Sequence, residues 1–120
     1  MEVDIINFIE SSIPSLRNRI YPIFTTEARE TSVTYLFKPI NGGHVLQSQL
    51  ELRVIGLYYD EVKELERILI DLLDIEDNKA SIAYGTTYFR SSLSGGGILF
   101  RDDLQMYEDI LYFTIRWRCK

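Results

Sequence analysis

The chain has very little of the chemistry that most active sites require. Its 120 residues include one cysteine, Cys119, and one histidine, His44. A single cysteine excludes a disulfide within these residues, and a zinc site would need further ligands. Sequence order alone leaves a Ser-His or Cys-His pair open. We interpret His44 as an ordinary turn residue and Cys119 as incidental, and we predict a protein that is not an enzyme and has no cofactor or metal.

Long apolar segments and a targeting signal are missing as well. No apolar run approaches the ~20 residues that a membrane-spanning helix needs. Residues 1–12 are acidic and amphipathic, and they lack the basic start and apolar centre of a signal peptide. We therefore expect a soluble protein that is not secreted through a cleaved signal and that has no membrane partner.

Positive charge is scarce relative to negative charge. The chain has 13 Lys and Arg against 18 Asp and Glu, which gives a net charge of −5 and a pI of about 4.8. Stable binding to DNA or RNA needs clustered cations that displace counterions. We therefore expect no specific nucleic-acid binding, although an acidic surface would let DNA slide past without sticking.

The hydrophobic content of 46% is enough for one core, and the length fits a single domain over residues 1–120. Alternating and helical apolar spacings predict the elements, and Gly and Pro mark the turns. In the first part of the chain we predict a helix at Met1–Ser12, an extended piece at Arg19–Pro22 and a surface loop at Phe24–Thr31. Two strands follow at Ser32–Lys38 and Val45–Leu57, joined by the turn Pro39–Gly43, and then a helix that Asp60 caps and Glu76–Asn78 closes. The last part is predicted to contain a strand at Ser81–Ser92, a flexible connector at Ser91–Gly97 and a strand at Met106–Arg118.

This order of helix, hairpin, helix and hairpin predicts an α+β fold. Strands that follow one another and are joined by turns favour antiparallel pairing. We predict a four-stranded, mostly antiparallel sheet with two helices packed on one face. In the last strand, the face that carries Leu111, Phe113 and Ile115 is apolar and is expected to lie against the core.

Two groups of acidic residues invite comparison with cation sites. The first is Asp74, Glu76 and Asp77, and the second is Asp102, Asp103, Glu108 and Asp109. Neither group has the glycine and the closing glutamate of an EF-hand loop. We interpret both as solvated surface, with Ca²⁺ or Mg²⁺ binding and salt bridges across a subunit interface as the alternatives.

The stretch Gly95–Gly97 leads into Ile98, Leu99 and Phe100 rather than into the Lys and Ser/Thr of a phosphate loop. One interpretation is a floppy hairpin loop. The other is a mobile arm, anchored by these three apolar residues, that becomes ordered on contact with a partner.

Three cations, Arg116, Arg118 and Lys120, share one side of the last strand. They are either solubilising charges near an edge or terminus, or a basic strip that meets an acidic patch on a neighbouring copy. The sequence leaves both interpretations open.

Three segments together resemble the tail-completion or tail-terminator proteins of long-tailed bacteriophages and prophages. The first is Arg19-Ile20-Tyr21-Pro22 after the N-terminal helix, followed by an irregular stretch and the strand 33–37. The second is the strand 51–58, ELRVIGLY, which leads into a helix that opens with Asp60-Glu61-Val62. The third is Asp102-Asp103 ahead of the final strand 111–115. The chain departs from the family pattern at Thr31-Ser32, where a proline would be expected, and in its glycine stretch.

The resemblance implies a virion structural protein in the tail, at the end nearest the head, after assembly in the host cytoplasm. Such proteins form a ring, commonly a hexamer, that caps the tail tube, ends its growth and forms the tail side of the head–tail joint. The implied partners are further copies of the chain, the tail tube protein and a head-completion or connector protein, with DNA only passing through the lumen. The alternatives are another neck component, namely a head-completion or stopper ring, or a small non-enzymatic binding module. The expected interface residues are Gly95, Gly96, Gly97, Ile98, Leu99, Phe100, Tyr112, Thr114, Arg116 and Arg118.

Overall fold

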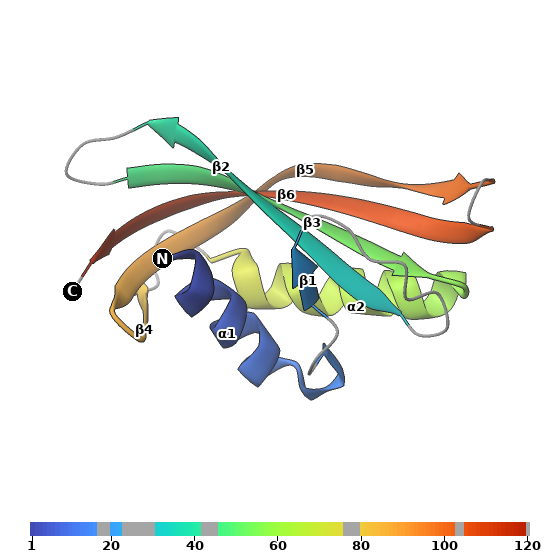
Figure 1. Cartoon of the computed structure of the whole chain (residues 1–120), viewed down its shortest axis with the longest axis horizontal. Coiled ribbons are helices and arrows are strands. Elements are labelled where there is room, and N and C mark those ends of the chain that lie inside the picture. Colours follow the sequence, from blue (N-terminus) through green and yellow to red (C-terminus); the bar gives the residue numbers. More distant parts are fainter. Residues whose placement is uncertain (17–19, 23–30, 42–45, 76–79, 103–104, 120) are drawn as a thin grey trace.

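A computed structural model of the chain describes residues 1–16, 20–22, 31–41, 46–75, 80–102 and 105–119 (Figure 1). The elements are α1 (Glu2–Ser12), a 3₁₀ turn (Pro14–Leu16), β1 (Ile20–Pro22), β2 (Ser32–Asn41), β3 (Leu46–Gly56), α2 (Tyr59–Leu73), β4 (Ile82–Tyr84), β5 (Thr87–Arg101) and β6 (Met106–Cys119). The predicted loop Phe24–Thr31 lies almost wholly outside the described residues, and so do His44 and residues 76–79.

The strands form one curled, mixed sheet of six strands in the order β1-β2-β3-β6-β5-β4. The first pair, β1 and β2, is parallel, and every other neighbouring pair is antiparallel. The predicted four-stranded sheet is therefore wrong. The difference comes from the edges, where the short extended piece Ile20–Pro22 joins as β1 and the third predicted strand divides into β4 and the start of β5.

The division between β4 and β5 occurs at Gly85, which takes a φ of 59° in a tight turn. A Cβ atom at this position would lie 2.2 Å from Oδ1 of Asp4, so the turn has no room for a side chain. The Asp4 carboxylate instead accepts hydrogen bonds from the backbone N–H and hydroxyl of Thr86 and from the hydroxyl of Thr87, the last at 2.7 Å. These bonds attach α1 to the β4–β5 turn.

The predicted flexible connector at Ser91–Gly97 is also wrong, because β5 runs through it without a break. Gly95 pairs with Tyr112 and Gly97 with Ile110, after a register shift between Leu93 and Gly95. A Cβ atom on Gly96 would lie 2.3 Å from the carbonyl oxygen of Ile110. Glycine thus permits a close approach to β6, which supplies a pairing partner along the whole stretch.

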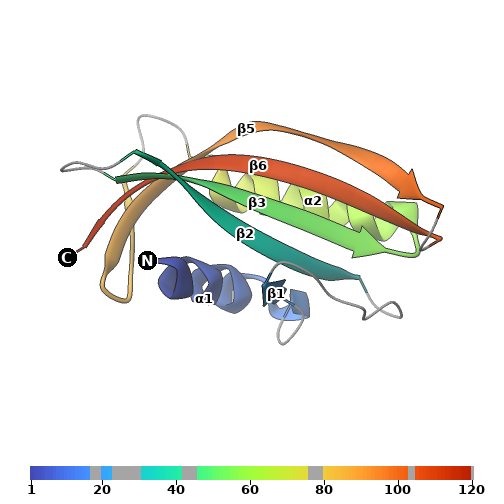
Figure 2. The same cartoon turned by 45° about the horizontal axis from the view of Figure 1, so that its top comes forward.

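Both helices lie against the concave face of the curled sheet, as the two views in Figures 1 and 2 agree. They enclose a single core whose largest fully buried side chains come from both helices and the central strands. These are Ile5, Ile9, Leu16, Val33, Leu50, Leu52, Val54, Leu69, Leu73, Phe89, Phe113 and Ile115. The prediction that Leu111, Phe113 and Ile115 face the core is confirmed.

Helix α2 begins two residues earlier than expected, with Tyr58 at its N-cap and no side-chain cap. Asp60 lies inside the first turn, so its predicted capping role is wrong. At the other end, the hydroxyl of Ser91 donates to the carbonyl of Leu73, and the amide of Ile75 donates to the carbonyl of Ser91 at 2.9 Å. The end of α2 is therefore bound directly to β5.

Candidate interaction surfaces

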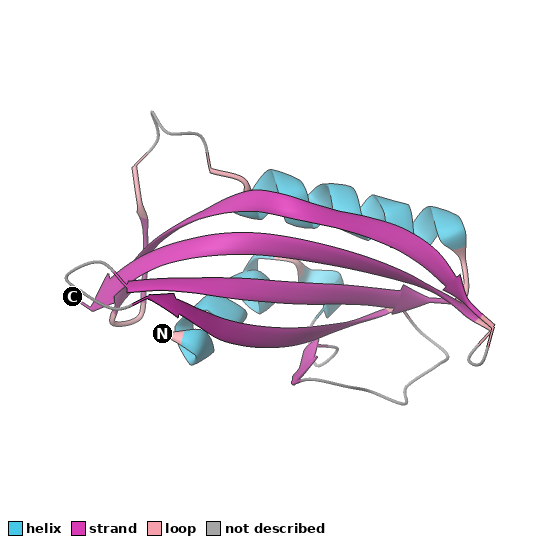
Figure 3. Cartoon of the chain, turned by 90° about the horizontal axis from the view of Figure 1, so that it is seen from above, coloured by secondary structure: helices cyan, strands magenta, loops and turns pink. Residues whose placement is uncertain are grey.

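The ten predicted interface residues do not form one patch. Tyr112, Thr114, Arg116 and Arg118 alternate along β6 on the convex face, which Figure 3 shows from above. Phe100 instead packs on Tyr107 on the concave side, near the turn between β5 and β6. Phe100 and the two arginines therefore belong to different surfaces, which lie near opposite ends of a molecule that measures 44 × 25 × 25 Å.

The first surface, which we call the aromatic end, consists of Leu57, Tyr58, Tyr59, Phe100 and Tyr107. The Tyr107 ring makes edge-to-face contacts with Tyr59 and Phe100, at centroid distances of 5.5 and 5.1 Å. Tyr58 is 64% exposed and Phe100 is 45% exposed. Clustered exposed apolar groups on a small protein are typical of protein–protein contact sites.

Gly56 produces this cluster by ending β3 where the chain turns into α2. A Cβ atom there would lie 2.8 Å from Oγ1 of Thr31 and 2.9 Å from Cγ2 of Val62. The turn places Leu57 and Tyr58 outside the core and leaves them exposed. Sequence reasoning did not select these residues, although an apolar run that continues past the end of a strand was a usable signal.

Three exposed carboxylates border the aromatic end, and we call them the acidic rim: Asp60 and Glu64 in the first turns of α2, and Asp102 after β5. Glu61 is close by, and its Oε2 accepts a hydrogen bond from the hydroxyl of Thr31 at 3.0 Å. Acidic residues at the start of a helix also stabilise it through its dipole. The rim therefore has a local structural role besides any role in contacts.

The second surface, the arginine end, consists of Tyr88, Arg90, Arg116 and Arg118 on the convex side of β5 and β6. Strand register places Arg90 opposite Arg116 and Tyr88 opposite Arg118. The guanidinium carbon of Arg118 lies 5.0 Å from the centre of the Tyr88 ring. These four residues, together with Ser81, Phe89 and Trp117, line an open hollow of about 260 Å³.

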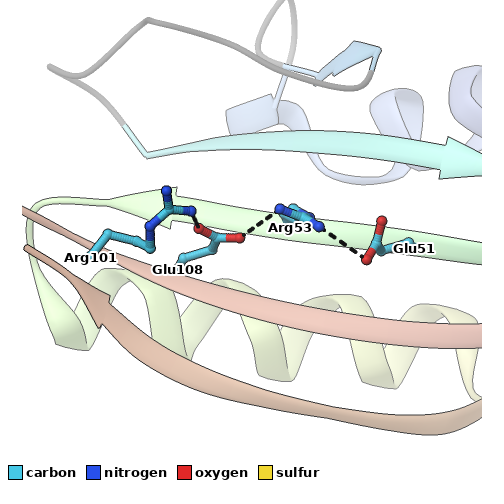
Figure 4. Close-up of polar contacts among 4 residues, drawn as sticks. All are labelled: Glu51, Arg53, Arg101 and Glu108. Carbon is cyan, nitrogen blue, oxygen red and sulfur yellow. Dashed lines mark hydrogen bonds and ion pairs between the residues drawn. The ribbon is translucent and has the colours of Figure 1, made fainter. Parts of the chain in front are cut away.

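Toward the aromatic end, the convex face carries a paired network of charges (Figure 4). Arg53 on β3 contacts Glu108 on β6 at 3.0 Å and Glu51 at 3.3 Å, and Arg101 on β5 contacts Glu108 at 2.7 Å. Glu108 is only 3% exposed, so its interpretation as solvated surface is wrong. The two arginines cover its carboxylate, and this network binds three strands together.

The neighbouring Asp109 is buried on the opposite, concave face beneath α2. No donor among the described residues reaches either of its carboxylate oxygens. Burial, together with the adjacent Glu66, raises the pKa of Asp109 to about 7. A hydrogen bond from Asp109 in turn lowers the pKa of Glu66, which also forms an ion pair with Lys63 at 3.1 Å. We infer that Asp109 keeps a proton and, through it, donates a hydrogen bond to the Glu66 carboxylate.

Asp109 was also predicted to be solvated surface, and that prediction is wrong. The sequence carried the contrary signal, because Asp109 alternates with Leu111 and Phe113 on the core face. Of the first acidic group, Asp74 accepts a hydrogen bond from the amide of Leu93 at 3.0 Å, while Glu76 and Asp77 lie outside the described residues.

Within the part of the chain that the structure describes, no cluster of His, Cys, Asp and Glu is arranged to hold a metal ion. Cys119 is exposed near the end of β6. None of the described helices is long and apolar enough to cross a membrane. No protein-family model, curated protein or solved structure matches the chain.

Proposed function

We propose that this chain is a virion structural protein that caps the head-proximal end of a phage tail tube as a ring. In this role it ends tail growth and forms the tail side of the head–tail joint. One observation carries the proposal: the subunit is elongated and has unlike exposed surfaces near its two ends. Head-to-tail contacts that close into a ring require two different patches on each subunit.

The form of the β5–β6 hairpin supports this proposal. A mobile glycine arm would lose conformational freedom on binding, whereas Gly95–Gly97 are already held in a continuous strand. The hairpin therefore presents Phe100 on an ordered support, which reduces the entropic cost of a contact. The expected partners are further copies of the chain, the tail tube protein and a connector protein of the head.

Electron microscopy of the purified protein, alone and mixed with tail tubes assembled in its absence, tests the proposal. We expect rings at high protein concentration and a ring on one end of each tube. Monomers together with uncapped tubes would contradict the proposal and favour a small binding module.

Deletion of the gene gives an independent test. Without a cap, tube subunits would continue to add, so we expect tails of irregular length in electron micrographs of lysates. Tails of normal length that lack heads would instead favour a stopper or head-completion ring.

A further inference from the structure

Charge is distributed unevenly along the long axis of the subunit. At one end, the acidic rim formed by Asp60, Glu64 and Asp102 lies close in the chain to the exposed rings of Tyr59 and Phe100. Near the other end, three arginines gather around Tyr88. Two further arginines, Arg53 and Arg101, lie toward the aromatic end on the convex face, and both are already paired with buried carboxylates. Each end therefore has the opposite charge to the other, and both carry aromatic groups.

The arginine end presents exposed cations. The register places Arg90 opposite Arg116, and the side chains of Arg116 and Arg118 are both exposed. None of the described residues forms an ion pair with Arg116 or Arg118. The hollow of about 260 Å³ that these two residues help to line is therefore open to an external anion.

We propose that the arginine end of one copy binds the acidic rim and aromatic end of the next copy, head to tail. Arg116 and Arg118 would pair with Asp60 and Glu64 at the edge of the contact, while Tyr58 and Phe100 supply its apolar centre. Arginine and tyrosine suit this arrangement because arginine both pairs with carboxylates and stacks on aromatic rings. This inference rests on the proposed ring and names the contact that would close it.

A carboxylate partner fits better than the phosphates of a nucleic acid. The chain has a net charge of −5, and the exposed faces of α1 and α2 are mostly acidic. A DNA duplex bound at the three arginines would be repelled by the rest of the surface. A second copy instead brings its acidic rim to the arginines and its own arginines elsewhere.

Charge exchange between the two ends tests the contact. Analytical ultracentrifugation measures self-association of three variants: Arg116→Glu with Arg118→Glu, Asp60→Lys with Glu64→Lys, and all four changes together. We expect each double variant to associate roughly tenfold or more weakly than the unaltered protein, and the fourfold variant to recover most of the loss. Association of the unaltered protein should weaken between about 50 mM and about 500 mM salt.

Two matched variants serve as controls. Arg116→Lys with Arg118→Lys keeps the charge and should keep most of the association. Glu10→Lys with Asp71→Lys changes the net charge by the same amount as Asp60→Lys with Glu64→Lys, but at residues outside both ends, and should leave association nearly unchanged. Circular dichroism of every variant must first show the unaltered fold, because an unfolded variant would lose association for a trivial reason.

Several outcomes would overturn the inference. They are association that the arginine reversal leaves intact, a fourfold variant that does not recover, and an unaltered protein that remains monomeric at every concentration. A further one is arginine reversal that abolishes binding of a fluorescent DNA duplex without affecting self-association. If the charge-reversed variants still form rings that cap tail tubes, the proposed contact is wrong but the proposed function is unaffected. If neither the unaltered protein nor any variant caps tubes, the proposed function itself is contradicted.

Discussion

Glu108 and Asp109 are adjacent in β6 and both are almost fully buried, yet their surroundings are opposite. The Glu108 side chain points to the convex face, where its carboxylate forms ion pairs with Arg53 and Arg101. Asp109 points to the concave face, where it meets Glu66 and finds no donor. The comparison shows that burial alone does not decide whether a carboxyl is charged. The partners on its side of the sheet decide it, and strand alternation assigns neighbours to different sides.

The largest expected effect comes from removing the charge of Glu108. Glu108→Gln replaces an acceptor of two charge-assisted contacts with an amide, and its N–H₂ group cannot accept from the arginines. We expect a loss of about 2–3 kcal/mol in the free energy of unfolding, measured by urea denaturation near neutral pH. Arg67→Met, on the exposed side of α2, is the control and should have little effect. A loss as small as that of the control would show that water already replaces the arginine contacts.

Gly96 and Gly97 repeat the contrast between neighbours on opposite faces of one strand. A Cβ atom on Gly96 would collide with β6, whereas one on Gly97 would meet nothing within 4 Å. We expect Gly96→Ala to cost about 2 kcal/mol, because the strands must move apart. Gly97→Ala should be neutral or slightly stabilising. Thermal unfolding of both variants checks this, and equal losses would remove the distinction between the faces.

The charge of Glu108 is expected to stabilise the fold, whereas a charge on Asp109 is expected to destabilise it. The folded pKa of Asp109, about 7, lies above the ordinary value of 3.8, so the folded protein retains a proton that the unfolded chain releases. The resulting stability is full below about pH 4 and is lost as the pH rises to about 7. The lowered pKa of Glu66 acts only nearer its ordinary value of 4.5, so the window from about pH 5 to 7 belongs to Asp109.

Asp109→Asn supplies an amide donor to Glu66 without a proton that can be lost. We expect the variant to be about 1–2 kcal/mol more stable than the unaltered protein near pH 8 and about equal to it near pH 5. Urea denaturation across this range measures the difference. A variant that is destabilised by the same amount at both pH values would contradict the shared proton.

The smallest effect on stability is expected at Tyr58, because its side chain is mostly exposed. Tyr58→Ser should change the free energy of unfolding by less than about 0.5 kcal/mol. The same change should weaken self-association, because exposed tyrosines often dominate interfaces. Sedimentation and urea denaturation on one sample separate the two effects. A large loss of stability would show that Tyr58 supports the fold and is not available for contacts.

The central part of the fold follows from local patterns in the sequence. Alternation predicted β2, β3 and β6, and helical spacing predicted α1 and α2, each to within a few residues. The extended conformation of β1 and β4 was also predicted, but their places as separate edge strands were not, because each has only three residues and its pairing is not visible in local alternation. The glycine stretch was misread for the same reason, since its order comes from β6 and not from its own residues.

The site residues show a similar division. The pattern predicted that Arg116 and Arg118 share one face, which the β6 register bears out. It could not predict that Tyr59 and Phe100 both contact Tyr107 at one end, because these contacts require the two hairpins to pair through β3 and β6. It also assigned Glu108 to solvent, since the arginines that cover it come from two other strands.

The β3–β6 pairing has a consequence for how the chain folds. The β2–β3 and β5–β6 hairpins each join strands that are close in sequence, whereas Leu52 of β3 pairs with Leu111 of β6 across the whole of α2 and β4. Closing a long loop costs entropy before its contacts repay it, so we expect the docking of the two hairpins to limit the folding rate. Nascent chains would expose the unpaired edge of β3 in the β2–β3 hairpin until β6 has been synthesised, and during that interval they would be most prone to pair with one another.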